Sequence, residues 1–247
     1  MGPPRPVGPG GGVGHSGRVG VEELPVPDPV EIRQASLEEL ERLGIPLPPE
    51  SYPLTWEPGD AVTLRPLAEL EGRVAILHVV LERCFGMPSE VAMQWLLDAR
   101  LLEQVSKPEW QFLAGEKGDR DAFIMHLDAQ FAFAWLLGWA EHLDPSLHCP
   151  PALPKAFADI HGGETYQAWR TRSMPAPRDA REAAALLDLY YCLDWAYQEA
   201  TLRAESPPGD VDAYVIAQRR WALEWAVVFV GPYHDEPPGW EEVDLST

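Results

Sequence analysis

The residues best able to do chemistry lie in the last quarter of the chain, on two expected helices. The first, over residues 178–204, carries polar and aromatic side chains three and four residues apart, a spacing that places them on one helix face. The second, over residues 211–229, carries two adjacent arginines among apolar residues. Together they give one candidate binding set: Asp188, Tyr191, Asp194, Trp195, Arg219 and Arg220.

This set can make two kinds of contact. An ion pair between Asp188 or Asp194 and one of the two arginines would fix the register of the helices. Alternatively, the arginines and Tyr191 would hold an anionic ligand in a pocket between the helices, with a carboxylate as base. We favour the ion pair, because buried polar groups are usually satisfied within the structure.

No other motif in the sequence predicts catalysis or metal binding. It contains no Gly-x-Ser-x-Gly, no Gly-Lys-Ser/Thr phosphate loop and no His-Glu-x-x-His. Residues 12–17 match Gly-x-Gly-x-x-Gly, but neither a strand before them nor a helix after them is expected. Cys84, Cys149 and Cys192 lie far apart and lack metal-ligand spacing. The sequence therefore predicts no cofactor and no metal, and leaves open whether the protein is an enzyme.

The chain is strongly acidic, with 39 Asp and Glu against 19 Lys and Arg and a net charge of −20. Such a charge repels phosphate backbones and anionic lipids, so we expect neither nucleic acid nor a membrane surface as partner. It suits a basic protein partner, although solubility alone would also account for it. No apolar stretch reaches the ~20 residues of a membrane span and no apolar signal region begins the chain, so we expect a cytoplasmic protein.

Hydrophobic periodicity predicts an all-α fold, a single irregular domain of several helices. An apolar fraction of 46% and ten tryptophans are sufficient for a buried core. Residues 51–65 are expected to form a loop, and residues 227–230 to end the last helix rather than form a strand. Besides the two C-terminal helices, we expect helices over 36–43, 66–85, 89–102, a short stretch after a capping box at Ser106, and 119–143.

The N-terminal segment differs from the rest of the chain. Residues 1–30 contain eight glycines and seven prolines and almost no large apolar side chains. Such a composition cannot bury enough surface to offset the loss of chain entropy on folding. We therefore expect residues 1–31 to form a disordered Gly/Pro-rich tail and residues 32–247 to form the helical domain.

Several ordered blocks of sequence resemble one known family. They are Leu43-Gly-Ile-Pro46, Trp95-Leu-Leu97 and residues 106–113, 133–140, 187–196, 218–225 and 240–247. Their order and spacing are similar to a bacterial family known as domain of unknown function 4272, over about residues 32–247. The resemblance implies a mostly helical domain with no established activity, so no family catalytic residue is carried over.

The chain also departs from the family pattern at two polar positions. Members tend to show a Trp-Arg-x-Glu type segment just before Phe131, whereas this chain has Leu127-Asp-Ala-Gln130 there. In addition, Asp194 stands where a histidine commonly precedes the helix tryptophan. Two functions remain open. We favour a non-enzymatic interaction protein, of an accessory, regulatory or immunity type, that neutralises a basic partner. The alternative is an enzyme or small-anion binder with a pocket between the last two long helices.

Overall fold

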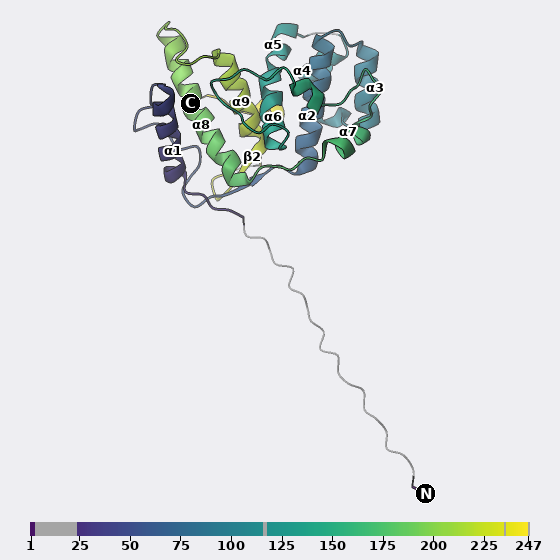
Figure 1. Cartoon of the computed structure of the whole chain (residues 1–247), viewed down its shortest axis with the longest axis horizontal. Helices are drawn as coiled ribbons and strands as arrows, with labels where there is room; N and C mark the ends of the chain where they lie inside the picture. The colour runs from purple at the N-terminus through teal and green to yellow at the C-terminus, as the bar shows by residue number, and fades with distance from the viewer. Residues whose placement is uncertain (3–23, 116–117, 235, 247) are drawn as a thin grey trace.

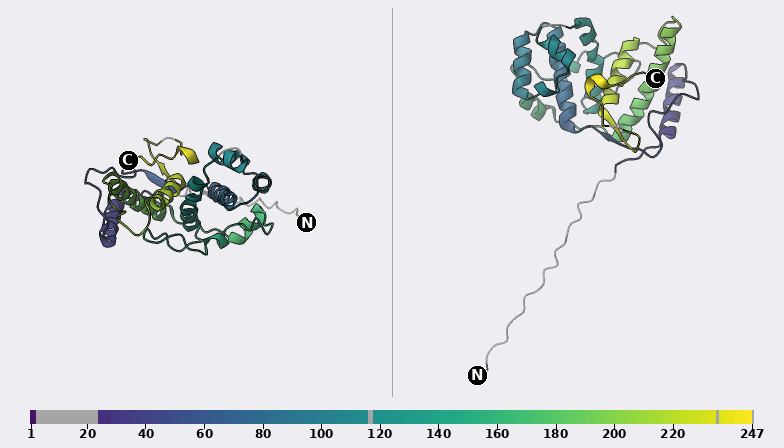
Figure 2. Two further views of the ribbon diagram at one scale, coloured as in Figure 1. Left: turned by 90° about the horizontal axis from the view of Figure 1, so that it is seen from above. Right: turned by 180° about the vertical axis from the view of Figure 1, so that it is seen from behind.

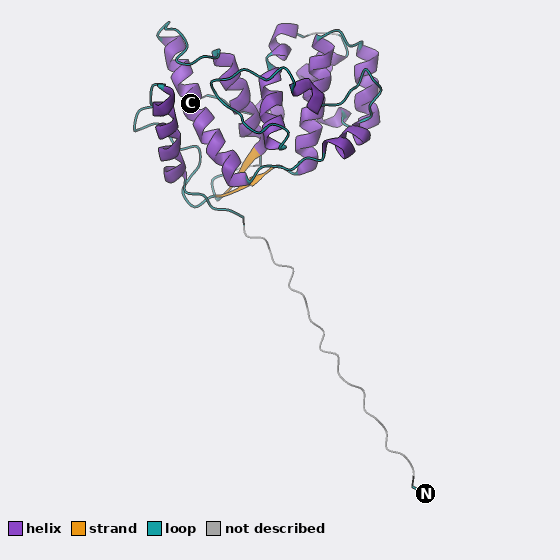
Figure 3. Ribbon diagram, in the orientation of Figure 1, coloured by secondary structure: helices purple, strands orange, loops and turns teal. Residues whose placement is uncertain are grey.

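The computed structural model describes residues 1–2, 24–115, 118–234 and 236–246, and within them the chain is mostly helical, as the sequence predicts (Figures 1 and 3). The elements follow one another as α1 Pro29–Leu43, β1 Ala61–Leu64, α2 Leu67–Cys84, α3 Ser89–Ala99, α4 Lys107–Leu113, α5 Arg120–Ile124, α6 His126–Leu136, α7 Tyr166–Ser173, α8 Ala180–Leu202, α9 Ala213–Ala226 and β2 Val227–Val230. Short 3-10 turns are η1 Leu102–Gln104, η2 Leu153–Ala156 and η3 Trp240–Glu242.

The longer helices stand side by side in the order α1, α8, α9, α6, α2 and α3 (Figure 1). The views of Figure 2 keep this order, with α1 at one end and α3 at the other. In the middle of the row, α6 and most of α2 are buried on every side, and α2 buries the polar side chains of Glu71, Arg73 and His78 together with its apolar residues. The helix α6, from the apolar stretch of residues 119–143, therefore lies at the centre of the fold.

The length expected for that stretch is wrong. It forms two helices, α5 and α6, separated at Met125, and α6 ends at Leu136. Gly138 adopts a left-handed conformation with φ of 78°, which stops the helix. The chain then turns so that Ala176 and Arg178 donate backbone hydrogen bonds to the carbonyls of Leu137 and Leu136.

The structure also contains a small antiparallel sheet that the sequence does not predict. β1 pairs with β2 so that Val62 lies opposite Phe229. Residues 227–230 are therefore a strand and not a helix end, and residues 61–64 are not a loop. Three of the four β2 residues are valine, whose branched side chain favours extended backbone. Trp56 stacks on Phe229 with ring centroids 4.9 Å apart, which covers one side of the strand.

Some helix ends lie where the sequence predicts them, and others do not. The capping box at Ser106 and the end of α1 at Gly44 are confirmed. However, α1 begins at Pro29, where Asp28 accepts a hydrogen bond from the Val30 amide at 2.8 Å, and not at Ser36. The helix thus starts inside the segment assigned to the tail, of which residues 3–23 lie outside the described residues. Among the described helices, none has the length and apolar character needed to cross a bilayer.

Candidate functional site

Arg220 lies at the centre of the predicted binding set, on α9, with its side chain 1% exposed. Its Nη1 lies 2.6 Å from Asp194 Oδ2 on α8, and its Nε lies 3.3 Å from Glu224 Oε1. The same Nη1 donates to the carbonyl of Leu245 at 3.2 Å. The guanidinium carbon is 4.7 Å from the centre of the Tyr191 ring. One of the predicted ion pairs, Asp194 with Arg220, is therefore present.

Arg219 points to a different interface, although it is the neighbouring residue. Its Nη2 lies 2.7 Å from Asp128 Oδ1 on α6, and its side chain is fully buried. It also donates to the carbonyls of Asp144 and Leu147, both at 2.8 Å. These contacts join α9 to α6 and to the segment that follows α6.

Asp188 pairs with neither arginine of α9. It receives two hydrogen bonds from the Nε and Nη2 of Arg33 on α1, the shorter at 2.8 Å, and a third from Thr55 Oγ1 at 2.5 Å. Tyr191 lies between the two ion pairs, because the Arg33 guanidinium is 5.6 Å from its ring. Trp195 is half-buried and its ring centroid is 6.1 Å from that of Tyr52. The predicted set is thus divided among the α1–α8, α8–α9 and α6–α9 interfaces.

The sequence interpretation did not name Arg33 or Asp128 as partners. A signal for Asp128 existed, since it is the lone carboxylate in the apolar stretch of residues 126–137, and a buried carboxylate needs a charged or hydrogen-bonding partner. For Arg33 the partner is 155 residues away, and no local spacing indicates it.

The C-terminal segment, residues 236–246, is fixed to the helices by Trp240. Its indole is 5% exposed and stacks on Trp221 with centroids 5.3 Å apart. Trp221 Nε1 donates to the Trp240 carbonyl at 2.9 Å, and the Arg73 guanidinium lies 4.9 Å from the Trp240 ring centre. Glu241, Glu242 and Asp244 remain exposed. The segment is therefore anchored by its tryptophan and presents its carboxylates to solvent.

Two hollows flank this segment. The first, here called the α8–α9 groove, has a volume of about 420 Å³ and is lined by Asp194, Tyr197, Gln198, Thr201, Leu202, Ala213, Tyr214, Ala217 and Leu245. The second, here called the acidic hollow, has a volume of about 300 Å³ and is lined by Glu224, Val227, Val228, Phe229, His234, Glu236, Pro237, Pro238, Glu242, Val243 and Asp244. Burial raises the pKa of Glu224, which lies under this hollow, and Arg220 acts in the opposite direction.

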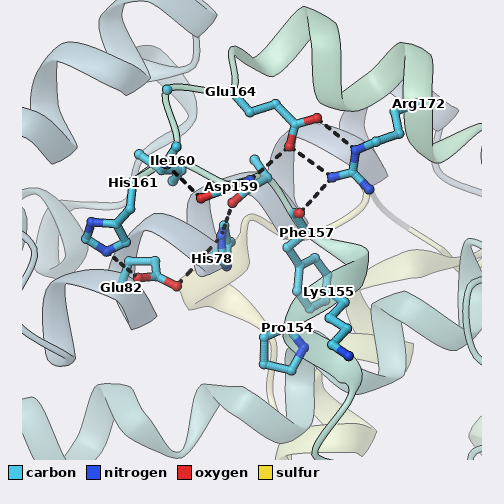
Figure 4. A pocket seen from close by; sticks show the side chains of 13 residues that line it. His78, Glu82, Pro154, Lys155, Phe157, Asp159, Ile160, His161, Glu164 and Arg172 are labelled. Atoms are coloured by element: carbon cyan, nitrogen blue, oxygen red, sulfur yellow. Dashed lines mark hydrogen bonds and ion pairs between the residues drawn. The ribbon is translucent and has the colours of Figure 1, made fainter.

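A third and larger hollow, of about 700 Å³, lies at the C-terminal end of α2 and is closed by residues 154–164 and by α7 (Figure 4). There His161 Nε2 donates to Glu82 Oε2 at 3.0 Å. His78 Nε2 donates to the Ala158 carbonyl at 2.9 Å and stays 3.9 Å from Glu82. Burial lowers the pKa of His78, so its imidazole is neutral at neutral pH.

One kind of chemistry that this third hollow could support is proton transfer. A carboxylate that holds an imidazole can orient it as a general acid or base, as Glu82 holds His161. The lining residues include no Ser, Thr, Cys or Tyr, but they do include the amine of Lys155. The Arg172 guanidinium is bound by both oxygens of Glu164, at 2.8 and 2.9 Å, so its charge is neutralised. The sequence signal for this hollow was the spacing of His78 and Glu82, four residues apart on one helix.

Neither metal nor cysteine chemistry gains support from the described residues. Among them, no three His, Cys, Asp or Glu side chains are placed to hold a metal ion. Burial raises the pKa of Cys84 to about 11 and those of Cys149 and Cys192 to about 12. All three therefore remain protonated at neutral pH and are poor nucleophiles.

Comparison with known families gives one match. The family model described as "Domain of unknown function (DUF4272)" matches residues 32–243, which is most of the chain. No curated protein and no solved structure matches.

Proposed function

The chain belongs to the DUF4272 family, and we propose that it is a non-enzymatic, acidic interaction protein, of an accessory, regulatory or immunity type, that binds a basic protein partner. The observation that carries this proposal is the anchored C-terminal segment. Trp240 holds it on the helices while Glu241, Glu242 and Asp244 face solvent. Acidic groups held in place before binding lose little conformational entropy when a partner arrives, which favours affinity.

The distribution of charge supports the same function. Within the described residues, four buried ion pairs join the helices: Arg33–Asp188, Arg73–Glu109, Arg219–Asp128 and Arg220–Asp194. They take four of the 19 basic and four of the 39 acidic residues, so 15 basic residues remain against 35 acidic ones. The surplus negative charge therefore lies outside these pairs. A surface with this surplus accelerates association with a basic protein and disfavours nucleic acid and anionic membranes.

The alternative function is an enzyme or small-anion binder with its pocket between α8 and α9. The α8–α9 groove lies at that place and favours it. However, Arg220, which would hold the anion, already contacts two carboxylates and a carbonyl. An anion would have to displace Asp194, whose side chain is 4% exposed. We therefore place this alternative second.

A cytoplasmic location is part of the proposal. The three cysteines are free thiols, two of them buried, in the described structure. Unpaired thiols are usual in compartments that keep cysteines reduced.

Affinity capture tests the proposed function. The bait is the full chain, and the matched control bait replaces Glu241 and Glu242 by Gln and Asp244 by Asn, which keeps Trp240 in place. We expect the wild-type bait to retain a basic protein at about 0.1 M salt, to release it at about 0.5 M salt, and the control bait to retain much less. Capture of the same protein by both baits, or of nothing above the level of an empty matrix, would contradict the proposal.

A further inference from the structure

The α8–α9 groove and the acidic hollow meet at the C-terminal segment. Asp244 lines the acidic hollow, and the next residue, Leu245, lines the groove. Beneath them, Arg220 contacts Asp194 on the groove side and Glu224 on the hollow side, and it donates to the Leu245 carbonyl. The two hollows are therefore parts of one surface, and Arg220 fixes the segment that separates them.

The groove is mainly apolar. Tyr197, Leu202, Tyr214 and Leu245 form its walls, and two alanines of α9 leave space between them. Leu202 is 81% exposed and Tyr214 is 40% exposed, although both have large apolar side chains. Exposed apolar surface that lines a concave site is typical of a site that binds another molecule.

Carboxylates border the groove on two sides. Asp212 stands directly before α9, and its side chain does not cap that helix. Asp212 is the residue before Ala213, and Ala213 and Tyr214 both line the groove, so Asp212 lies at its edge. On the other side lie Asp244 and the carboxylates of the acidic hollow. No Lys or Arg is among the residues that line either hollow.

We propose that this surface docks a basic amphipathic segment of the partner protein. An apolar side chain of that segment enters the α8–α9 groove, while its Lys or Arg side chains meet Asp212, Asp244 and the acidic hollow. The inference rests on the proposed function and names the surface and the partner chemistry for it. Amphipathic helices bind apolar grooves in this way, and opposite charge at the rim sets their orientation.

Charge complementarity decides between this occupant and others. A second copy of this chain would bring another net charge of −20 to an acidic rim, so like charges would repel. An anionic lipid surface is repelled for the same reason. A basic segment removes this repulsion and covers the exposed apolar side chains at the same time.

A peptide titration against the full chain tests the inference. The probe is a fluorescent 14-residue peptide of Leu and Lys with the leucines on one helix face. The comparison peptides are a scrambled sequence of the same composition and a peptide with Glu in place of every Lys. We expect the amphipathic Lys peptide to bind at least tenfold more tightly than the scrambled one, and the Glu peptide not to bind.

Two variants locate the binding surface. Ala217→Trp fills the groove, and Leu202→Ser removes an exposed wall residue without touching the core, so it serves if the first variant does not fold. Each should weaken the Lys peptide at least threefold. Leu97→Ser, a change at an exposed leucine of α3 at the far end of the row of helices, is the control and should bind as the wild type does.

The outcomes separate the two proposals. If folded Ala217→Trp and Leu202→Ser bind the Lys peptide as tightly as the wild type, the groove is not the docking surface, while the proposed function stands. If the wild type binds the scrambled peptide as well as the amphipathic one, the groove proposal is again overturned. If the wild type binds no Lys peptide, or binds the Glu peptide equally, both proposals are overturned.

Discussion

Arg220 on α9 and Asp194 on α8 lie 2.6 Å apart, and their side chains are 1% and 4% exposed. Because the same guanidinium nitrogen donates to the Leu245 carbonyl, this contact joins two helices and the C-terminal segment. A buried charge that already has a carboxylate partner is not free to bind a ligand. The two residues with the strongest chemical promise in the sequence therefore hold the domain together.

The ion pair between Arg33 and Asp188 predicts a large stability effect. In Arg33→Met, Asp188 would stay buried without its cation, because it is 1% exposed and lies between α1 and α8. Removing one partner of a buried pair costs about 3–5 kcal/mol. Urea unfolding followed by circular dichroism should show a loss of this size.

The control for this change is Arg42→Met. Arg42 pairs with Glu39 on the solvent side of the same helix, and its side chain is 66% exposed. Solvent screens such pairs, so the unfolding midpoint should not move measurably. Equal losses in both variants would mean that the Arg33–Asp188 pair is no more important than a surface pair.

Trp240 predicts a second stability effect. Trp240→Ala would remove a buried indole that contacts Trp221, Trp225 and Phe133, at a cost of about 3–5 kcal/mol. Trp240→Phe keeps an aromatic ring, and it removes an indole N–H that has no hydrogen-bond partner within the described structure, so its cost should be much smaller. Limited proteolysis should cut the C-terminal segment of the Ala variant first. A Phe variant as unstable as the Ala variant would show that the N–H has an acceptor.

How far the sequence predicts the site follows from these residues. The positions of α8 and α9 and the Asp194–Arg220 pair follow from helical spacing and hydrophobicity. The division of the set does not. Arg219 and Arg220 are adjacent, so they point about 100° apart on the helix and face different neighbours. Which neighbours those are depends on the packing of α1 and α6, which local spacing does not encode.

The buried histidines predict the pH dependence of stability. Burial lowers the pKa of both His78 and His126 below the ~6.5 of a free imidazole. The unfolded chain then takes up protons below pH ~6.5 that the folded chain does not bind. The stability they contribute is complete above that pH and falls as pH decreases, by up to about 1.4 kcal/mol per pH unit for each histidine.

The measurement compares the wild type with His126→Gln in urea unfolding between pH 7 and pH 5. We expect a shallower loss of stability in the variant, because one source of proton uptake on unfolding is gone. His142→Gln, at an exposed histidine, is the control. Burial raises the pKa of Glu224 and Asp128, which acts in the opposite direction, so the difference between slopes is the informative quantity. Identical slopes in the wild type and His126→Gln would refute the assignment.

The backbone conformation of Gly138 explains why α6 ends at Leu136, and it predicts the effect of a substitution on stability. Its φ of 78° favours glycine, and a Cβ atom added there would lie 2.5 Å from the Ala176 carbonyl oxygen. Gly163 has a similar φ of 80° but open space around it. Gly163→Ala should cost about 1 kcal/mol for the left-handed conformation alone. Gly138→Ala should cost roughly 1–3 kcal/mol more, because residues 174–178 must move. Equal costs in thermal unfolding would mean that this close approach is absent.

The errors in the fold prediction have a common origin in short local signals. The apolar stretch of residues 119–143 looks like one continuous helix by its periodicity. However, the stretch contains Gly138, a residue type that commonly ends helices, and the helix does end there. The sheet is harder to predict, because a four-residue strand at Val227 follows α9 directly and pairs with residues about 165 positions earlier. Neither half of such a pair is distinguishable from a helix end or a loop until the partner is known.

The most direct test of the account is a double-mutant cycle on Arg220 and Asp194, measured by urea unfolding of the full chain. With Arg220→Met, Asp194→Leu and the double variant, we expect each single change to destabilise strongly. The coupling energy should reach about 2–3 kcal/mol, because either residue alone leaves a buried charge. A coupling energy near zero, with Arg220→Met as stable as the wild type, would contradict the account. It would show instead that Arg220 is free to hold a ligand between α8 and α9.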